Sequence, residues 1–346
     1  MRRYSEHFDV REYVMFGAVT LAVMALCVCV GSVSIPLKEI GQVLWGTLCG
    51  ESAPSGAHAA MILSIRIPRV LCVALEGASL SLAGAAMQGL LRNPLADGST
   101  LGVSAGASLG AVLAIAFGIS FPHLPFAGTM VMAILFAFLS LLLILALAWR
   151  MDSSLSTNTI ILIGVIFSMF ISSLINVIVT FASDRLHSIT FWTMGSLSAS
   201  TYPKALLLLI CLLLAGGVIF AHASELNAFS LGEDTARHIG VNIRRTRLLI
   251  LIAVSCLIGV CVAIGGMISF VGLVTPHMVR MIVGPNHKRL LPASLFGGAV
   301  FLMLADLAAR ILLDPIELPI GVVTSMVGAV VFIVIFLRTG EGGKHA

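Results

Sequence analysis

Charged side chains are scarce in this sequence. Only 10% of its 346 residues are Asp, Glu, Lys or Arg, whereas 59% are hydrophobic and the mean hydropathy is +1.08. A soluble domain carries about 25% charged residues, so a water-soluble globular protein is excluded. The basic residues are also scattered among loops and leave a net charge of only +4, which argues against nucleic acid as a partner. The composition indicates a polytopic membrane protein.

Motifs of redox, metal and nucleotide chemistry are missing as well. The seven cysteines lie mostly within apolar runs and form no C-x-x-C pair, as expected of small packing residues. The nine histidines are dispersed without paired metal spacing, so no bound metal or cofactor is expected. Nothing matches the phosphate-binding pattern G-x-x-x-x-G-K-[ST], and no Lys lies between positions 39 and 203. If this chain works with ATP, a separate subunit binds the nucleotide.

Long apolar segments dominate what is present. An α-helix needs about 20 apolar residues to cross the hydrocarbon core of a membrane. By this measure we predict an all-α protein in which residues 1–346 form a single transmembrane domain of about ten spans. The division between the seventh and eighth spans rests on Gly265 and Gly266. The spans lie near residues 14–34, 68–91, 101–118, 128–149, 158–181, 203–222, 247–267, 269–284, 291–312 and 318–337.

The distribution of basic residues predicts the orientation of the chain. Thirteen Lys and Arg residues lie on the same side as the N-terminus, six lie on the opposite side, and Arg280 lies within a span. Because Lys and Arg accumulate in cytoplasmic loops, we expect both termini in the cytoplasm. The protein is then a multi-pass protein of the cytoplasmic membrane.

Two polar loops carry more structure than a connection requires. The outer loop, residues 35–65, contains "PLKEIGQVLWG", which is amphipathic and predicts a short surface helix. The cytoplasmic loop, residues 223–246, has acidic residues from Glu233, basic residues from Arg237 and a terminal glycine at Gly240. This order complements the helix dipole and ends a helix. The sequence therefore predicts a short capped helix on which another protein docks.

A G-x-S-x-G pattern begins at Gly102 and has two interpretations. With Gly106 and Gly110, Gly102 forms a four-residue repeat of small residues, which lets helices pack closely in lipid. In serine hydrolases the same pattern places the nucleophile, here Ser104, on a strand-to-helix turn. No strand precedes it in this sequence, and His277 is the one well-placed partner for an intramembrane hydrolase. We expect packing rather than catalysis.

Ionisable residues within spans raise a further alternative, because they are costly in lipid and often functional. Asp306 and Arg310 are four residues apart on one helix, so they form either a local ion pair or a site with Arg310 as an exposed docking charge. Glu76 either lines a water-filled path or pairs with Arg69 or Arg66. An ion-coupled secondary transporter would use Glu76 and Asp306.

Six stretches of the chain resemble one known family, and the resemblance extends over nearly the whole chain from Arg66 to Leu337. They are "RIPRV", "GASLSLAGAAMQGLLRNPLADGSTLGVSAGASLG", "LSTNTIILIGV", "LGEDTARHIGV", "ISFVGLVTPHMVR" and "DLAARILLDPIELPIGVVTSMVGAVVF". They are similar to the permeases of ATP-driven importers for vitamin B12, iron-siderophore complexes and haem. The resemblance implies ten spans, no enzymatic activity and a homodimer around one translocation path. It also implies an ABC ATPase dimer on the cytoplasmic side, a substrate-binding protein outside and a substrate that is an iron chelate, haem or cobalamin.

The resemblance also implies roles for particular residues. Outer arginines dock the binding protein, a pair of short helices at about 225–240 contacts the ATPase, and a cytoplasmic gate forms at the turn after the second span and the start of the fifth. A turn is expected there, since Pro94 disfavours helical geometry in Asn93. The docking residues would be Arg66, Arg69 and Arg310; the coupling residues Leu231, Gly232, Glu233, Asp234, Ala236, Arg237 and Gly240; and the gate residues Asn93, Leu95, Ser156, Thr157 and Asn158.

Overall fold

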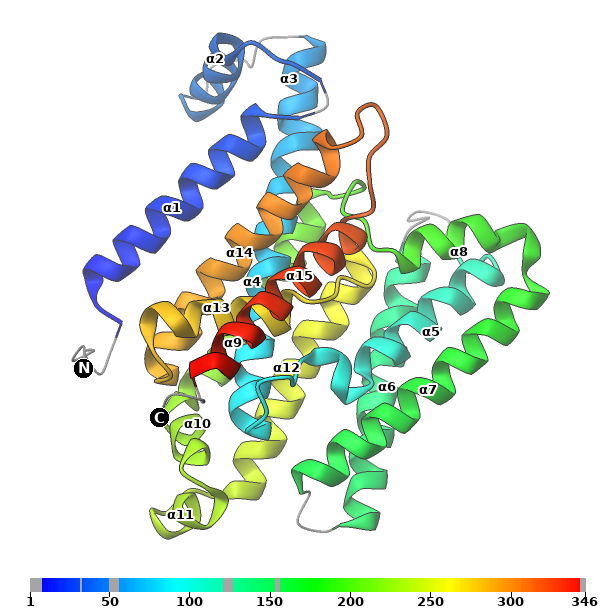
Figure 1. The fold of residues 1–346 in the computed structure, drawn as a ribbon. Coiled ribbons are helices and arrows are strands. Elements are labelled where there is room, and N and C mark those ends of the chain that lie inside the picture. The colour runs from blue at the N-terminus through cyan, green and yellow to red at the C-terminus, as the bar shows by residue number, and fades with distance from the viewer. Residues whose placement is uncertain (1–7, 32, 50–55, 121–126, 153–155, 343–346) are drawn as a thin grey trace.

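The computed structural model describes residues 8–31, 33–49, 56–120, 127–152 and 156–342, and all their regular structure is helical (Figure 1). The all-α prediction is therefore confirmed for this part of the chain. The helices are α1 (Val10–Cys29), α2 (Leu37–Leu48), α3 (Ala57–Met61), α4 (Ile67–Leu91), α5 (Val103–Ala116), α6 (Ala127–Met151), α7 (Thr157–Phe181), α8 (Leu186–Thr193), α9 (Tyr202–Ala221), α10 (Ala223–Ser230), α11 (Glu233–His238), α12 (Ile243–Gly265), α13 (Val271–Val283), α14 (His287–Ile311) and α15 (Ile320–Gly342).

The apolar helices coincide with the predicted segments. Seven are long and apolar enough to cross a membrane: α1, the continuous helix from α3 through a π-helical turn to α4, and α6, α7, α9, α12 and α14. The apolar stretches of α5, α13 and α15 are shorter. The predicted break between the seventh and eighth spans is present, since α12 ends at Gly265 and Gly266 takes a left-handed φ of 74°. The molecule is a polytopic helical membrane protein.

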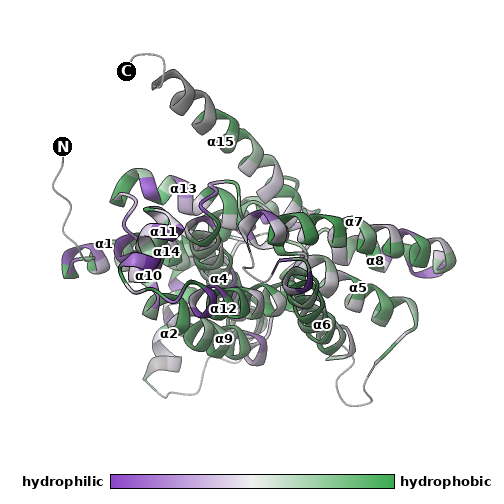
Figure 2. Ribbon diagram, turned by 90° about the horizontal axis from the view of Figure 1, so that it is seen from below, coloured by the Kyte–Doolittle hydropathy of each residue, from purple (hydrophilic) through white to green (hydrophobic). Residues whose placement is uncertain are grey.

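The helices have an upper end, where α2 and α3 lie, and a lower end, where α10 and α11 lie (Figure 1). The predicted amphipathic helix of the outer loop is α2, which buries Ile40 and Val43 and exposes Trp45. Seen from below, hydrophilic residues gather around α10 and α11, while α6, α7 and α9 are mostly hydrophobic (Figure 2). The molecule thus has an apolar flank and a polar lower end.

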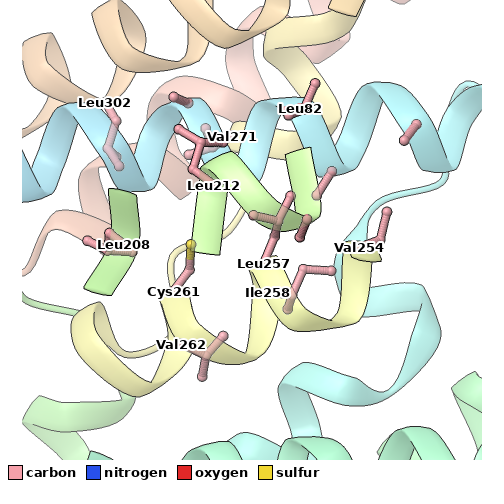
Figure 3. Packing of buried hydrophobic residues seen from close by; sticks show 14 of the residues in the cluster. Leu82, Leu208, Leu212, Val254, Leu257, Ile258, Cys261, Val262, Val271 and Leu302 are labelled. Carbon is pink, nitrogen blue, oxygen red and sulfur yellow. The ribbon is translucent and has the colours of Figure 1, made fainter. Parts of the chain in front are cut away.

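Helix α4 lies at the centre of the bundle and packs at backbone distance from its neighbours. Apolar side chains such as Leu82 and Leu212 fill the space between α4, α9 and α12 (Figure 3). On the other faces of α4, small residues take the place of large apolar side chains. A Cβ atom added at Gly84, for example, would overlap the backbone of Gly272 in α13. Because lipid tails are as apolar as side chains, helices in membranes associate through such close packing of small residues. The position of α4 therefore depends on its glycines.

The repeated glycines around α5 have two different tasks. Cβ atoms at Gly106 and Gly110 would overlap Ser140 and the carbonyl of Met132, both in α6, so α5 and α6 meet at these two glycines. Gly102 was predicted to share this helical face, but it precedes the helix as its N-cap and has a φ of 73°. It follows a 3-10 turn (Gly98–Leu101) in this left-handed conformation, which glycine adopts without steric cost.

Helix α1 is fixed at its two ends and packs little between them. Its buried residues are Cys27 and Val28, both in its last turn. Just before its start, Phe8 packs into an apolar cluster with residues of α13 and α14, and Glu12 forms an ion pair with Arg289. The long central part of α1 therefore contacts the bundle only lightly.

Candidate functional site

A cavity of about 720 Å³ opens at the lower end of the molecule. Three elements enclose it: the end of α4, the start of α7 and the turn between α10 and α11. It thus brings together segments that are far apart in the sequence, including four of the predicted gate residues and four of the predicted coupling residues. Its lining is Leu91, Arg92, Asn93, Ser156, Thr157, Asn158, Ile161, Leu231, Gly232, Glu233, Asp234 and Thr235.

The turn after α4, residues 92–97, forms one wall of this cavity. Helix α4 ends because Arg92 takes a left-handed conformation with a φ of 49°, as a C-cap residue often does. Asn93 then accepts a hydrogen bond on its Oδ1 atom from the backbone N–H of Leu95, at 2.9 Å. Such a side-chain contact two residues along the chain stabilises a turn. Leu95 itself is half exposed and is not among the residues that line the cavity.

The start of α7 forms the opposite wall. Ser156 is the N-cap residue, and its hydroxyl lies 2.8 Å from the hydroxyl of Thr159. The backbone N–H of Ser156 donates to the carboxylate of Asp152 at 3.1 Å. Thr157 is partly buried and Asn158 is exposed. Short polar side chains therefore fix this helix start and leave hydrogen-bonding groups directed at the cavity.

The third wall is the helix pair α10 and α11, and it contains the short helix predicted from the order of charges. Gly232 separates the two helices with a φ of 113°. Arg247, which is fully buried in α12, donates to Glu233 in the first turn of α11. Breaking such an ion pair by removing one partner leaves an uncompensated buried charge. Helix α11 is thereby fixed to a membrane-spanning helix.

The segment of α10 and α11 also carries exposed apolar side chains, one of which, Leu231, borders the cavity. Leu231 and Ile239 are 68% and 63% exposed, although both are large and apolar. Arg237, which lies between them in the sequence, is also exposed, whereas Ala236 is buried. Gly240 ends the segment with a φ of 91°. An apolar and basic surface of this kind, at the end of an otherwise polar loop, is typical of a protein contact.

The three arginines expected to be exposed at the upper end are buried instead. Arg66, Arg69 and Arg310 are only 5%, 8% and 4% exposed. Arg66 donates to the carbonyl of Val28 at 2.9 Å, and Arg310 donates to the carbonyl of Cys27 at 3.3 Å. The last carbonyls of a helix have no partner within the helix, so the two guanidinium groups satisfy the end of α1. The prediction that these arginines are exposed was wrong, because Arg66 and Arg310 are buried against the end of α1 and Arg69 is buried in an ion pair with Asp306.

Arg69 forms a buried ion-pair network with two carboxylates. Its Nη2 atom lies 3.0 Å from Asp306 and its Nη1 atom 2.9 Å from Glu317, the latter at the molecular surface. Asp306 also pairs with Arg310 at 3.1 Å, so the local ion pair is the correct one of the two interpretations for these residues. The network joins α4, α14 and the loop before α15 at the upper end.

The alternative roles for buried polar residues receive little support from the geometry. Glu76 is fully buried, and among the described residues neither carboxylate oxygen has a hydrogen-bond partner. Of the two alternatives for Glu76, the pairing with Arg69 or Arg66 is wrong, because both arginines bond elsewhere. Ser104 lies in the first turn of a helix, and no hydrogen bond joins it to His277 in the described part of the chain. Residues 8–342, apart from the undescribed gaps, contain no group of three or more His, Cys, Asp and Glu placed to hold a metal.

Two buried arginines of the lower end were not predicted to be buried. Arg247 and Arg289 were counted only as cytoplasmic loop charges, yet they are 0% and 4% exposed and pair with Glu233 and Glu12. One signal was available, since each is followed directly by leucines of an apolar helix. A basic residue in that position is placed to be buried with a partner.

Comparison with known proteins places the chain among the permeases of ABC transporters. The FecCD transport family matches residues 19–338. The chain is 41% identical to the uncharacterised ABC transporter permease YvrB of Bacillus subtilis, over 95% of this chain and 93% of that protein. It is 35% identical to the molybdate import system permease MolB of Haemophilus influenzae, over 96% and 97% of the two chains.

A solved structure has the same fold. It is an inward-facing conformation of a metal-chelate-type ABC transporter, and it aligns with a TM-score of 0.84 and 31% sequence identity over 95% of this chain and 100% of that one. The family match and the similar fold both identify a permease of an ABC importer. They rule out the two alternative interpretations, a secondary transporter and a serine hydrolase. The chain therefore belongs to the FecCD transport family and is the membrane-spanning permease of an ABC importer, whose ATP-hydrolysing subunit is a separate protein.

Proposed function

We propose that two copies of this chain form one importer with an ABC ATPase dimer and an external substrate-binding protein. Residues 1–346 then make a single permease domain of ten spans with both termini in the cytoplasm. The observation that carries this proposal is the lower cavity, where the exposed helix pair α10 and α11 adjoins the turn after α4. A partner that moves α10 and α11 also moves the walls of that cavity. The lower end is thus the cytoplasmic end, and α1 begins and α15 ends toward it (Figure 1).

A polar stripe on α7 supports a second copy of the chain. Ser168, Ser172, Asn176 and Thr180 recur every fourth residue on this apolar helix, and the last three are exposed. The hydroxyl of Thr180 bonds the carbonyl of Asn176 in its own helix, at 2.8 Å. An exposed asparagine amide is costly against lipid. We therefore place this face of α7 along a water-filled path between the two copies.

The helix pair α10 and α11 is the proposed contact for the ATPase. Reversing the charge at Arg237, in Arg237→Glu, should lower the substrate imported per ATP hydrolysed by about tenfold, a typical size for coupling between two sites. The measurement is uptake and ATP hydrolysis by the complete importer in proteoliposomes. Arg11→Glu is the matched control, because Arg11 is equally exposed at the start of α1. An unchanged amount of substrate imported per ATP hydrolysed in Arg237→Glu would refute the coupling role. Gly240→Ala tests the same role independently.

At the opposite end we propose that the binding protein docks over α2, α3 and the loop before α15. Arg66, Arg69 and Arg310 shape this rim from within rather than contact the partner, since each is buried and bonded inside the chain. Glu317 is the member of the Arg69 network that reaches the surface. Charges on such a rim set the rate and register of docking more than its affinity.

For the substrate we propose an iron chelate, such as a siderophore complex or haem, or cobalamin. The family membership and the metal-chelate-type structural relative support this class, and the MolB relative makes molybdate the alternative. In such an importer the binding protein selects the substrate. Calorimetric titration of the binding protein that associates with this permease should show tight binding of one metal chelate. Binding of molybdate with no response to ferric siderophores, haem or cobalamin would contradict the proposal.

A further inference from the structure

Asn227 joins α10 to the start of α14. Its Nδ2 atom donates to Oδ1 of Asn286 at 2.8 Å, and its Oδ1 atom accepts from the backbone N–H of His287 at 2.8 Å. The backbone N–H of Lys288 donates to Oδ1 of Asn286 at 3.0 Å. Backbone donors therefore fix which end of each amide is oxygen. Asn227 is inserted into the N-terminal cap of α14, 59 residues away in the sequence.

His287 continues this connection toward α4. Its ring Nδ1 atom lies 2.9 Å from Oδ1 of Asn227 and donates to it, which leaves Nε2 as the unprotonated nitrogen. The side chain is 4% exposed, and Nε2 has no hydrogen-bond partner among the described residues. That atom faces Gly89, where an added Cβ would overlap it. The ring thus fills the space that only a glycine in the last turn of α4 leaves open.

The last turn of α4 is held on its other side by Gln88. Its Nε2 atom donates to the carbonyl of Leu273 at 3.1 Å, and Arg280 donates to its Oε1 atom at 3.0 Å. Both partners belong to α13. The end of α4 is therefore clamped between α13 and His287 of α14, and the turn of residues 92–97 follows three residues after Gly89. The end of α4 therefore touches His287 on one side and α13 on the other.

We propose that Asn227 and His287 are positioning residues that transmit movement of the ATPase-contacting helix α10 to the turn of residues 92–97. This inference rests on the proposed contact of α10 and α11 with the ATPase. Asn227 carries the displacement of α10 into the start of α14, and the ring of His287 carries it to Gly89. The turn then moves with the end of α4 and changes the width of the lower cavity.

The first test uses Asn227→Leu in the complete importer, in which Leu keeps the side-chain size and removes both hydrogen-bonding groups. Spin labels at Leu95→Cys in the two permease copies report the distance between the two turns, in a background where the exposed Cys49 and Cys256 are Ser. The unmodified sequence at 227 should show a change in this distance when ATP binds. Asn227→Leu should abolish the change and lower import per ATP by about tenfold, while ATPase binding stays unchanged.

Four further variants keep the test independent of folding. Asn227→Asp retains the acceptor for His287 and should preserve most of the coupling. Lys288→Gln keeps the backbone N–H that bonds Asn286 and changes only the side chain, so it should behave as the unmodified protein. Gly89→Ala should impair assembly through its overlap with His287. Gly89→Ala combined with His287→Ala should restore assembly but not coupling.

Each opposite outcome has a defined meaning. An intact distance change in Asn227→Leu, full coupling in the double variant, or a loss of ATPase binding in Asn227→Leu would each overturn the transmission role; the last would make Asn227 a docking residue. If the unmodified chain binds no ATPase and imports nothing with ATP, the proposed function itself fails, which is a separate result.

Discussion

Replacement of Arg69 by Met is expected to cause one of the largest losses of stability of any single change. Arg69 neutralises Asp306 in the interior and reaches Glu317 at the surface. Removing one partner of a buried ion pair costs about 3–5 kcal/mol, because the remaining charge stays in a medium of low polarity. We expect the lower part of this range, since Asp306 keeps its contact with Arg310. Thermal or denaturant-induced unfolding of the purified permease in detergent measures the loss.

Glu317→Gln provides the matched control for Arg69→Met. It removes the other carboxylate of the same network, but that side chain is 38% exposed. Exposed ion pairs contribute at most about 1 kcal/mol, so this variant should be nearly as stable as the unmodified protein. Equal losses of stability in the two variants would show that the exposed pair with Glu317 contributes most of the stabilisation by the network, contrary to the structure.

Gly84→Ala is the second change with a large expected effect. A methyl group at this position overlaps the backbone of Gly272, which cannot rotate away as a flexible side chain would. Overpacking of a close contact costs about 1–3 kcal/mol, and the upper part of that range applies where backbone must shift. The fraction of folded permease extracted from membranes, and its thermal unfolding, should both fall.

Gly17→Ala separates the effect of crowding from that of the substitution itself. Gly17 lies in α1 with nothing within 4 Å of an added Cβ. There the change should be neutral or stabilising by up to about 1 kcal/mol, because Ala is the better helix former. A loss of stability in Gly17→Ala as large as in Gly84→Ala would contradict the assignment of α4 as a close-packed central helix.

Local patterns in the sequence predicted the features that depend on neighbouring residues. Apolar length placed the spanning helices, and the order of acidic and basic residues after Gly232 placed α11. The turn at Asn93 followed from the proline after it. All of these depend on interactions within a few residues of the chain.

Contacts across the fold could not be predicted in the same way. Arg66 bonds a carbonyl 38 positions away, and Arg69 pairs with Glu317 at a separation of 248 positions. A basic residue near a loop is consistent with an exposed charge until the covering helix is known. The connection from Asn227 to His287 spans 60 positions and has no periodic pattern to reveal it. Even the resemblance to a family could not show which of these side chains are buried.

The two-ended attachment of α1 has a consequence for how this protein tolerates change. Arg66 and Arg310 hold its last carbonyls, and Phe8 and Glu12 hold its beginning. Between these points the helix needs only to be apolar and long enough, so substitutions there should accumulate freely among relatives of this chain. The residues at its two ends should not change independently, because each substitution there requires a matching substitution in α4 or α14.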